Sequence, residues 1–176
     1  MKKSILLSIL LMATSFTIST FAQEKTYEDI LENESKSIVE KHFSLGSVSV
    51  GNDRELRFSI VKVKYSGGNL SFLSVSGKSF NTYYSSVLIE KTDLKRIIDE
   101  IDAFLKQPAQ SDDSDLTKNY FMLKGKSYIM NQYEKSTDSA QSLWWFYFDS
   151  RKNERMSFDD FAPVLEKMKE ALTKMN

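Results

Sequence analysis

The sequence predicts an α+β fold, in which an N-terminal helix precedes two units, each an antiparallel β-meander followed by one helix. Three observations support this. Apolar and polar residues alternate in short runs between turn-forming residues, as in antiparallel strands. Two segments, from Asp93 and from Asp160, carry apolar residues at helical spacing. Each segment follows a strand-rich block, so the order of elements repeats and indicates a possible internal duplication.

The first predicted helix runs from Thr26 to about Leu45. Thr26 is a suitable N-cap, with Asp29 three residues further on, and Gly46 is a suitable stop. The only histidine, His42, falls in the last turn, where the helix dipole favours a positive side chain. We therefore interpret His42 as structural.

Four strands are predicted next, at residues 48–50, 56–65, 70–75 and 82–90, with a strong hairpin turn at residues 66–69. The alternation changes phase between Ile60 and Val61, and again between Phe72 and Leu73. Such a slip indicates either a β-bulge or a strand that passes between two environments.

The next helix is capped by Thr92, has Asp93 in its first turn and ends before Pro108. Residues 107–115 are the best candidate for a linker. Further strands are predicted at residues 119–123, 127–134 and 143–148, with a polar turn at 151–155. A terminal helix, marked by apolar residues from Phe158 to Met175, has Asp160 as its N-cap and Pro163 in its first turn.

The first 22 residues have the pattern of a cleaved secretory signal peptide. A basic start precedes an apolar stretch, and Thr20-Phe21-Ala22 supplies small residues before Gln23. An uncleaved anchor is the alternative, but the strongly apolar stretch is short for a bilayer. We expect an exported protein, periplasmic or secreted, with no membrane span after cleavage. It would be a single domain over residues 23–176, with halves at about 47–107 and 116–176.

Composition restricts the chemistry. The 176 residues include no cysteine and one histidine, which excludes disulfides, a thiol nucleophile and a two-histidine metal site, so we expect no metal and no cofactor. Lysine plus arginine balance aspartate plus glutamate at 24 each. Loss of Lys2 and Lys3 with the signal makes the net charge −2. This balance gives no electrostatic reason to bind nucleic acid.

The order of elements over most of residues 47–176 resembles the paired β4α units of the single-stranded-DNA-binding transcriptional regulator fold. No sequence motif supports this resemblance, so it implies neither residues nor activity. Separately, the double-lysine signal, the Ala-Gln junction at Ala22 and the cysteine-free, tyrosine-rich body resemble small exported domains of unknown function from Bacteroidetes-type bacteria. That resemblance is one of composition.

Two aromatic clusters are the candidate binding residues: Tyr83 and Tyr84, and the run from Trp144 to Phe148. If Trp145 and Tyr147 share an exposed face, they form a platform for a protein, peptide or glycan; the alternative is burial of both sheet faces. Asp138-Ser139-Ala140 resembles a Bacteroidetes O-glycosylation acceptor at Ser139.

The sequence thus favours a non-catalytic exported domain that binds a protein, peptide or glycan through an aromatic sheet face or a groove between the halves. Two alternatives stay open. One is a hydrolase that uses converging carboxylates, and the other is a carrier of an apolar ligand. The oligomeric state is not predicted.

Overall fold

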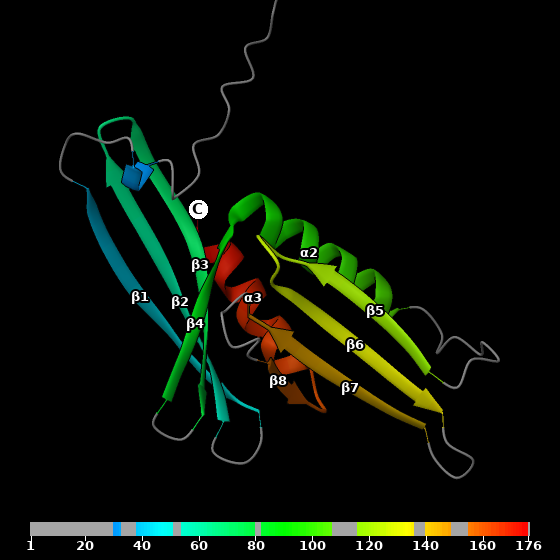
Figure 1. The fold of residues 1–176 in the computed structure, drawn as a ribbon. Helices are drawn as coiled ribbons and strands as arrows, with labels where there is room; N and C mark the ends of the chain where they lie inside the picture. Colours follow the sequence, from blue (N-terminus) through cyan, green and yellow to red (C-terminus); the bar gives the residue numbers. More distant parts are fainter. Residues whose placement is uncertain are drawn as a thin grey trace, which may run out of the picture. The chain divides into compact units, whose positions relative to one another are not determined.

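A computed structural model describes residues 30–32, 38–50, 54–79, 82–106, 116–135, 140–148 and 155–175 (Figure 1). The chain divides into two compact units, Met1–Glu34 and Ser35–Asn176. In the first unit, residues 30–32 are helical. The second unit is α+β and contains two four-stranded antiparallel sheets.

The first sheet contains β1 (Val39–Ser49), β2 (Arg54–Tyr65), β3 (Gly68–Ser79) and β4 (Thr82–Glu90), in that spatial order. Tyr65 pairs with Gly68, so β2 and β3 are joined by the two-residue turn Ser66-Gly67, as the hairpin signal predicted. Gly68 has φ +147°, a region that side-chain-bearing residues rarely adopt. The sequence-predicted strands of this block are confirmed in number and order.

The predicted helix over residues 26–45 is wrong from Val39 onwards, because these residues form β1. Val39–Ser44 pair with Ser59–Lys64 of β2. This pairing supplies the backbone hydrogen bonds that these residues would otherwise make within a helix. Gly46 is not a helix stop: it has φ +89° at the register shift after Ser44, and its N–H donates to the Ser44 hydroxyl (3.2 Å). It therefore belongs to a β-bulge. His42 lies exposed on β1, with Nε2 3.4 Å from Oε2 of Glu40.

The phase slip in β2 and β3 reflects two buried environments, not a bulge. Ile60 pairs with Leu73 and Val61 with Phe72, and the register between the two strands is continuous. All four side chains are buried. Adjacent residues of a strand point to opposite faces, so this part of the sheet is buried on both sides.

The helix α2 (Lys91–Leu105) follows β4 and buries Leu94, Ile97, Ile98 and Ile101. Its N-cap is Glu90, so Thr92 lies in the first turn and the predicted cap is wrong. The exposed side carries ion pairs one turn apart, Lys95 with Asp99 (2.5 Å) and Arg96 with Glu100 (2.9 Å). The predicted apolar stripe is the buried face.

The second sheet contains β5 (Leu116–Met122), β6 (Tyr128–Lys135), β7 (Ala140–Tyr147) and β8 (Arg155–Phe158), in that spatial order. β8 was not predicted, and Phe158 belongs to it instead of the terminal helix. The sequence does not reveal β8 because four residues are too few to show the alternation that identifies a strand.

The terminal helix α3 spans Ala162–Lys174 and has Pro163 in its first turn, as predicted. Its N-cap is Phe161, not Asp160. Asp160 nevertheless accepts a hydrogen bond from the Ala162 N–H (2.9 Å), so it caps the helix from one residue further back. No helix in the described part of the chain is long and apolar enough to cross a membrane.

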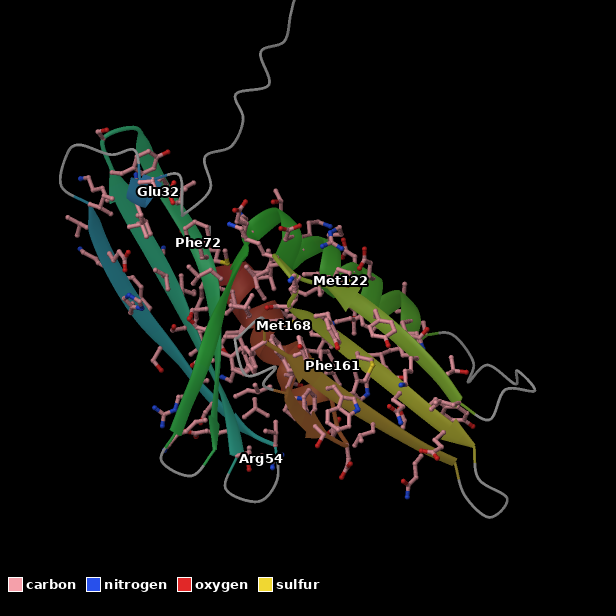
Figure 2. All side chains as sticks on the ribbon, in the orientation of Figure 1. Glu32, Arg54, Phe72, Met122, Phe161 and Met168 are labelled. Atoms are coloured by element: carbon pink, nitrogen blue, oxygen red, sulfur yellow. The ribbon has the colours of Figure 1, made fainter. Side chains whose placement is uncertain are left out.

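The helices join the two sheets into one core. α3, which follows the second sheet, contacts β1, β2 and β3 of the first; α2 contacts β3 and β4, and also β5 and α3. Within this core the rings of Trp144 and Phe161 stack with their centroids 4.3 Å apart. Phe104 of α2 lies edge-on to Trp144, at 5.9 Å between ring centroids. Figure 2 labels Phe161 and Met168, both buried in this core. Each sheet therefore depends on a helix from the other half of the sequence.

Candidate functional site

The aromatic run on β7 is divided between the two faces of the second sheet. Trp144 is 4% exposed, and Phe146 and Phe148 are buried in the core. Trp145 and Tyr147 point to the other side and are half-buried. The structure therefore puts these two candidate residues together on the outer face of the sheet.

Strand register brings further large side chains to the same face. Trp145 pairs with Met130, and Tyr147 pairs with Tyr128. On the edge strand β5, Tyr120 is 53% exposed and Met122 is 47% exposed. We call this surface the aromatic face; it consists of Tyr120, Met122, Tyr128, Met130, Trp145 and Tyr147.

The tyrosine rings on this face pack against one another. Tyr128 and Tyr147 stack at 4.5 Å with 9° between the ring planes, and Tyr120 meets Tyr128 edge-on at 5.4 Å. The indole nitrogen of Trp145 is buried. A stacked pair covers one face of each of its two rings, so Tyr128 and Tyr147 offer less open ring surface than two separate tyrosines would.

The other candidate residues lie elsewhere. Tyr83 and Tyr84 belong to β4 of the first sheet, while Trp145 and Tyr147 belong to β7 of the second. The side chains of Tyr83 and Tyr84 are outside the described residues, as is Ser139 with its glycosylation motif. The two aromatic clusters of the sequence are thus on different sheets.

Four residues of the aromatic face were not identified from the sequence: Tyr120, Met122, Tyr128 and Met130. The signal was present, because each pair is spaced two residues apart on a predicted strand and so shares one face. Sequence alone does not show that β5 and β6 bring them beside Trp145.

One face of the first sheet is polar near Arg57, whereas the same face buries Val61 and Val63 further along β2. The guanidinium of Arg57 lies 2.6 Å from Glu55, and Nζ of Lys78 lies 3.7 Å from the same carboxylate. Hydrogen bonds from Arg57 and Ser47 lower the pKa of Glu55. Serine side chains share the face, since Ser59 pairs with Ser74, and Arg57 with Ser76. The described side chains therefore give the two sheets different surfaces, one polar and one aromatic.

The described carboxylates with shifted pKa values are held ionised. Two lysines, Lys167 and Lys174, donate hydrogen bonds to Glu170 and lower its pKa to about 2. A general acid of the glycosidase type needs the opposite shift. Within the described ranges, no three histidine, aspartate or glutamate side chains are grouped so that they could hold a metal ion.

No protein family matches this chain, and no curated protein matches it either. The candidate site is therefore defined by its own geometry. Its main feature is the aromatic face of the second sheet.

Proposed function

We propose that this protein is an exported, non-catalytic binding domain that recognises a polypeptide through the aromatic face. The observation that supports this most directly is the gathering of three tyrosines, two methionines and Trp145 on one exposed or half-exposed sheet surface. Aromatic residues and methionine are enriched where proteins bind one another. Large exposed apolar patches on soluble domains often mark interaction sites.

Ring geometry favours a polypeptide over a glycan. A sugar ring stacks on an open aromatic face, but Tyr128 and Tyr147 already cover one face of each other. What stays accessible suits varied side chains: methionine adapts its shape, and tyrosine hydroxyls form hydrogen bonds. A glycan is the competing ligand in the test below.

Export is the second part of the proposal. It is supported by the basic start, the apolar stretch and the Ala22-Gln23 junction of the sequence. N-terminal sequencing of the protein recovered from the producing cell should begin at Gln23. A chain that still begins at Met1 would contradict cleavage.

We also propose that the two halves arose by duplication. Each consists of four antiparallel strands in sequential order followed by a helix, β1–β4 with α2 and β5–β8 with α3. The exchanged contacts of α2 and α3 fit a pair of units that fold together. Two chains can be designed, each with two copies of one of the units, and we expect at least one of these chains to fold. Failure of both such chains to fold would weigh against this origin.

The two neighbouring tryptophans provide a direct test of binding. Trp144 is in the core and Trp145 is on the aromatic face, so a ¹H–¹⁵N spectrum contains one reporter and one internal control. Titration with arrays of peptides and, separately, of oligosaccharides should shift the indole signal of Trp145 with peptides and leave that of Trp144 unchanged. Tyr147→Ala should weaken the response, whereas Ser74→Ala on the first sheet should not.

The outcomes separate the ligands. A response to oligosaccharides alone would replace polypeptide by glycan as the ligand. Equal shifts of both indoles would indicate a change in the core and not binding at this face. No response of Trp145 to either array would overturn the proposal.

A further inference from the structure

The register of the second sheet shows which backbone groups of β5 point away from it. The N–H of Leu123 donates to the carbonyl of Ser127 (3.0 Å), so this pair is hydrogen-bonded. In an antiparallel ladder, hydrogen-bonded and non-hydrogen-bonded pairs alternate. Counting back along β5, Phe121 and Asn119 direct their N–H and C=O groups to β6. Met122, Tyr120 and Lys118 direct theirs to the open edge.

An independent contact agrees with this assignment. The guanidinium of Arg96 on α2 donates to the carbonyl of Met122 (3.0 Å), which must therefore point out of the sheet. Figure 2 labels Met122 at the end of β5 next to α2. β5 is an edge strand, and no other strand of the described residues pairs with its open side. α2 contacts β5 through Arg96 at the Met122 carbonyl and through Phe104 at the Phe121 ring, so the outward backbone groups of Lys118 and Tyr120 are the part of this edge that can serve as a template for another strand.

The same residues carry the exposed side chains of β5. Leu116, Lys118, Tyr120 and Met122 lie on the outer face, and all four are exposed. Lys118 has no ion-pair partner among the described residues. A strand added to this edge would place alternate side chains next to Tyr120 and Met122, with one of them opposite Lys118.

We propose that an extended peptide of a partner protein pairs with β5 as a fifth strand of the second sheet. Its pattern is alternating: apolar side chains lie beside Tyr120 and Met122, and one acidic side chain lies opposite Lys118. Backbone hydrogen bonds supply affinity, and the alternate side chains supply specificity. This inference rests on the proposed function, because the aromatic face provides the side-chain contacts.

The long edge strand of the first sheet is less suited to this role. β1 is interrupted by the bulge at Gly46, which twists an edge and disrupts a regular ladder. Beyond the bulge, the exposed side chains include Ser47 and Ser49, which give a peptide little apolar surface. β5 pairs with β6 over its whole length without a register shift. Before the bulge β1 also exposes Val39 and Phe43, but only β5 combines a ladder without a shift over its whole length with a place beside the aromatic face.

The test uses nine-residue peptides with threonine at the odd positions. The even positions carry valine, leucine or tyrosine, except for glutamate at the sixth. Paired antiparallel to β5, this glutamate lies opposite Lys118. N-methylation at the fourth and sixth residues removes amides that would bond to β5, whereas N-methylation at the third and fifth removes amides that face away. The first change should weaken binding to the full mature protein at least tenfold, and the second should have little effect.

Hydrogen exchange identifies the position of the bound strand. Free amides of Lys118 and Tyr120 should exchange fast and become protected when peptide binds, while those of Asn119 and Phe121 are protected throughout. Lys118→Glu should reduce affinity about 2- to 5-fold, the range expected for an exposed ion pair, and lysine in place of the peptide glutamate should restore it. Lys118→Pro, which removes an outward N–H, should weaken binding more than Lys118→Ala.

Two results would overturn strand addition. Peptides that shift the indole signal of Trp145 without protecting Lys118 and Tyr120 would bind on the aromatic face alone, so the proposed function would stand and this inference would fail. Absence of binding by the whole peptide set would also end the inference. In that case the titration with the peptide and oligosaccharide arrays described above still tests the proposed function on its own.

Discussion

Neighbouring residues of this chain have different roles because a strand directs them to opposite faces. Trp144 stacks on Phe161 and Phe121 in the core, at 4.3 and 6.0 Å between ring centroids. Trp145 lies on the aromatic face beside Met130. The sequence shows two adjacent tryptophans. Their surroundings place Trp144 in the core and Trp145 half-buried on the outer face of the sheet.

Trp144→Ala should therefore lower the free energy of unfolding by about 3–5 kcal/mol, because it leaves a large cavity among packed rings. Trp145→Ala, its matched control, removes a half-buried ring and should cost clearly less. Urea denaturation monitored by circular dichroism measures both. Equal losses would contradict the assignment of the two faces.

Glu170 should titrate well below an ordinary glutamate. Lys167 and Lys174 lower its folded pKa to about 2 from 4.5, so its contribution to stability is present above about pH 4.5 and is lost as the pH falls towards 2. Carboxyl-carbon NMR measures the midpoint. Lys174→Met should raise the pKa of Glu170, because it removes one donor and one positive charge. A midpoint near 4.5 in the unaltered protein would show that the ion pairs do not persist in solution.

At the scale of elements, β1 shows how pairing overrides a local helical pattern. The apolar residues between Tyr27 and Phe43 include helical spacings, yet Val39–Ser49 extend along β2. The bulge after Ser44 moves the register by one residue, so that Leu45 reaches the buried side. The glycine at the bulge is required by its backbone conformation.

Gly46→Ala should destabilise the protein by about 1–2 kcal/mol, the cost of placing a side chain at positive φ. No atom lies within 4 Å of the added Cβ, so crowding contributes little. Ser49→Ala, also exposed on β1, is the control and should be nearly neutral. Thermal or urea unfolding distinguishes them, and similar values for both would argue against the positive φ at Gly46.

At the scale of the whole folded unit, the two halves share one hydrophobic core. α3 contacts three strands of the first sheet, and Lys169 of α3 pairs with Asp102 of α2 at 2.7 Å. The core includes residues of both sheets and both helices, among them Phe58, Ile97, Phe146 and Met168. We therefore expect both sheets to unfold in one cooperative transition.

Met168→Ala tests this coupling. Met168 is fully buried on α3, and its truncation should cost about 2–5 kcal/mol. Native-state hydrogen exchange should then be faster in β2 and β3 as well as in β6 and β7. The free energy of opening should fall by the same amount in both sheets. Glu166→Ala, on the exposed side of α3, should leave both sheets unchanged. Faster exchange confined to one sheet would show that the halves unfold independently.

The sequence by itself determined much of this architecture. Local chemistry was sufficient for the α+β class, the hairpin at Ser66-Gly67 and the amphipathic stripe of α2, because each depends on neighbours a few residues apart. It failed where the deciding partner is distant in sequence or the element is short. β1 became a strand by pairing with β2, and the four-residue β8 is held beside β7.

Only the tertiary structure decided the candidate site. Alternation predicted that Trp145 and Tyr147 share a face, but not whether that face is covered, and not that Tyr120, Tyr128 and two methionines lie beside them. Strand order likewise decides that one side of β5 has no strand partner in its sheet, and Arg96 of α2 donates to the outward carbonyl of Met122 on that side. The physical reason is that side-chain direction is a local property of a strand, whereas exposure and neighbours depend on which distant elements pack against it.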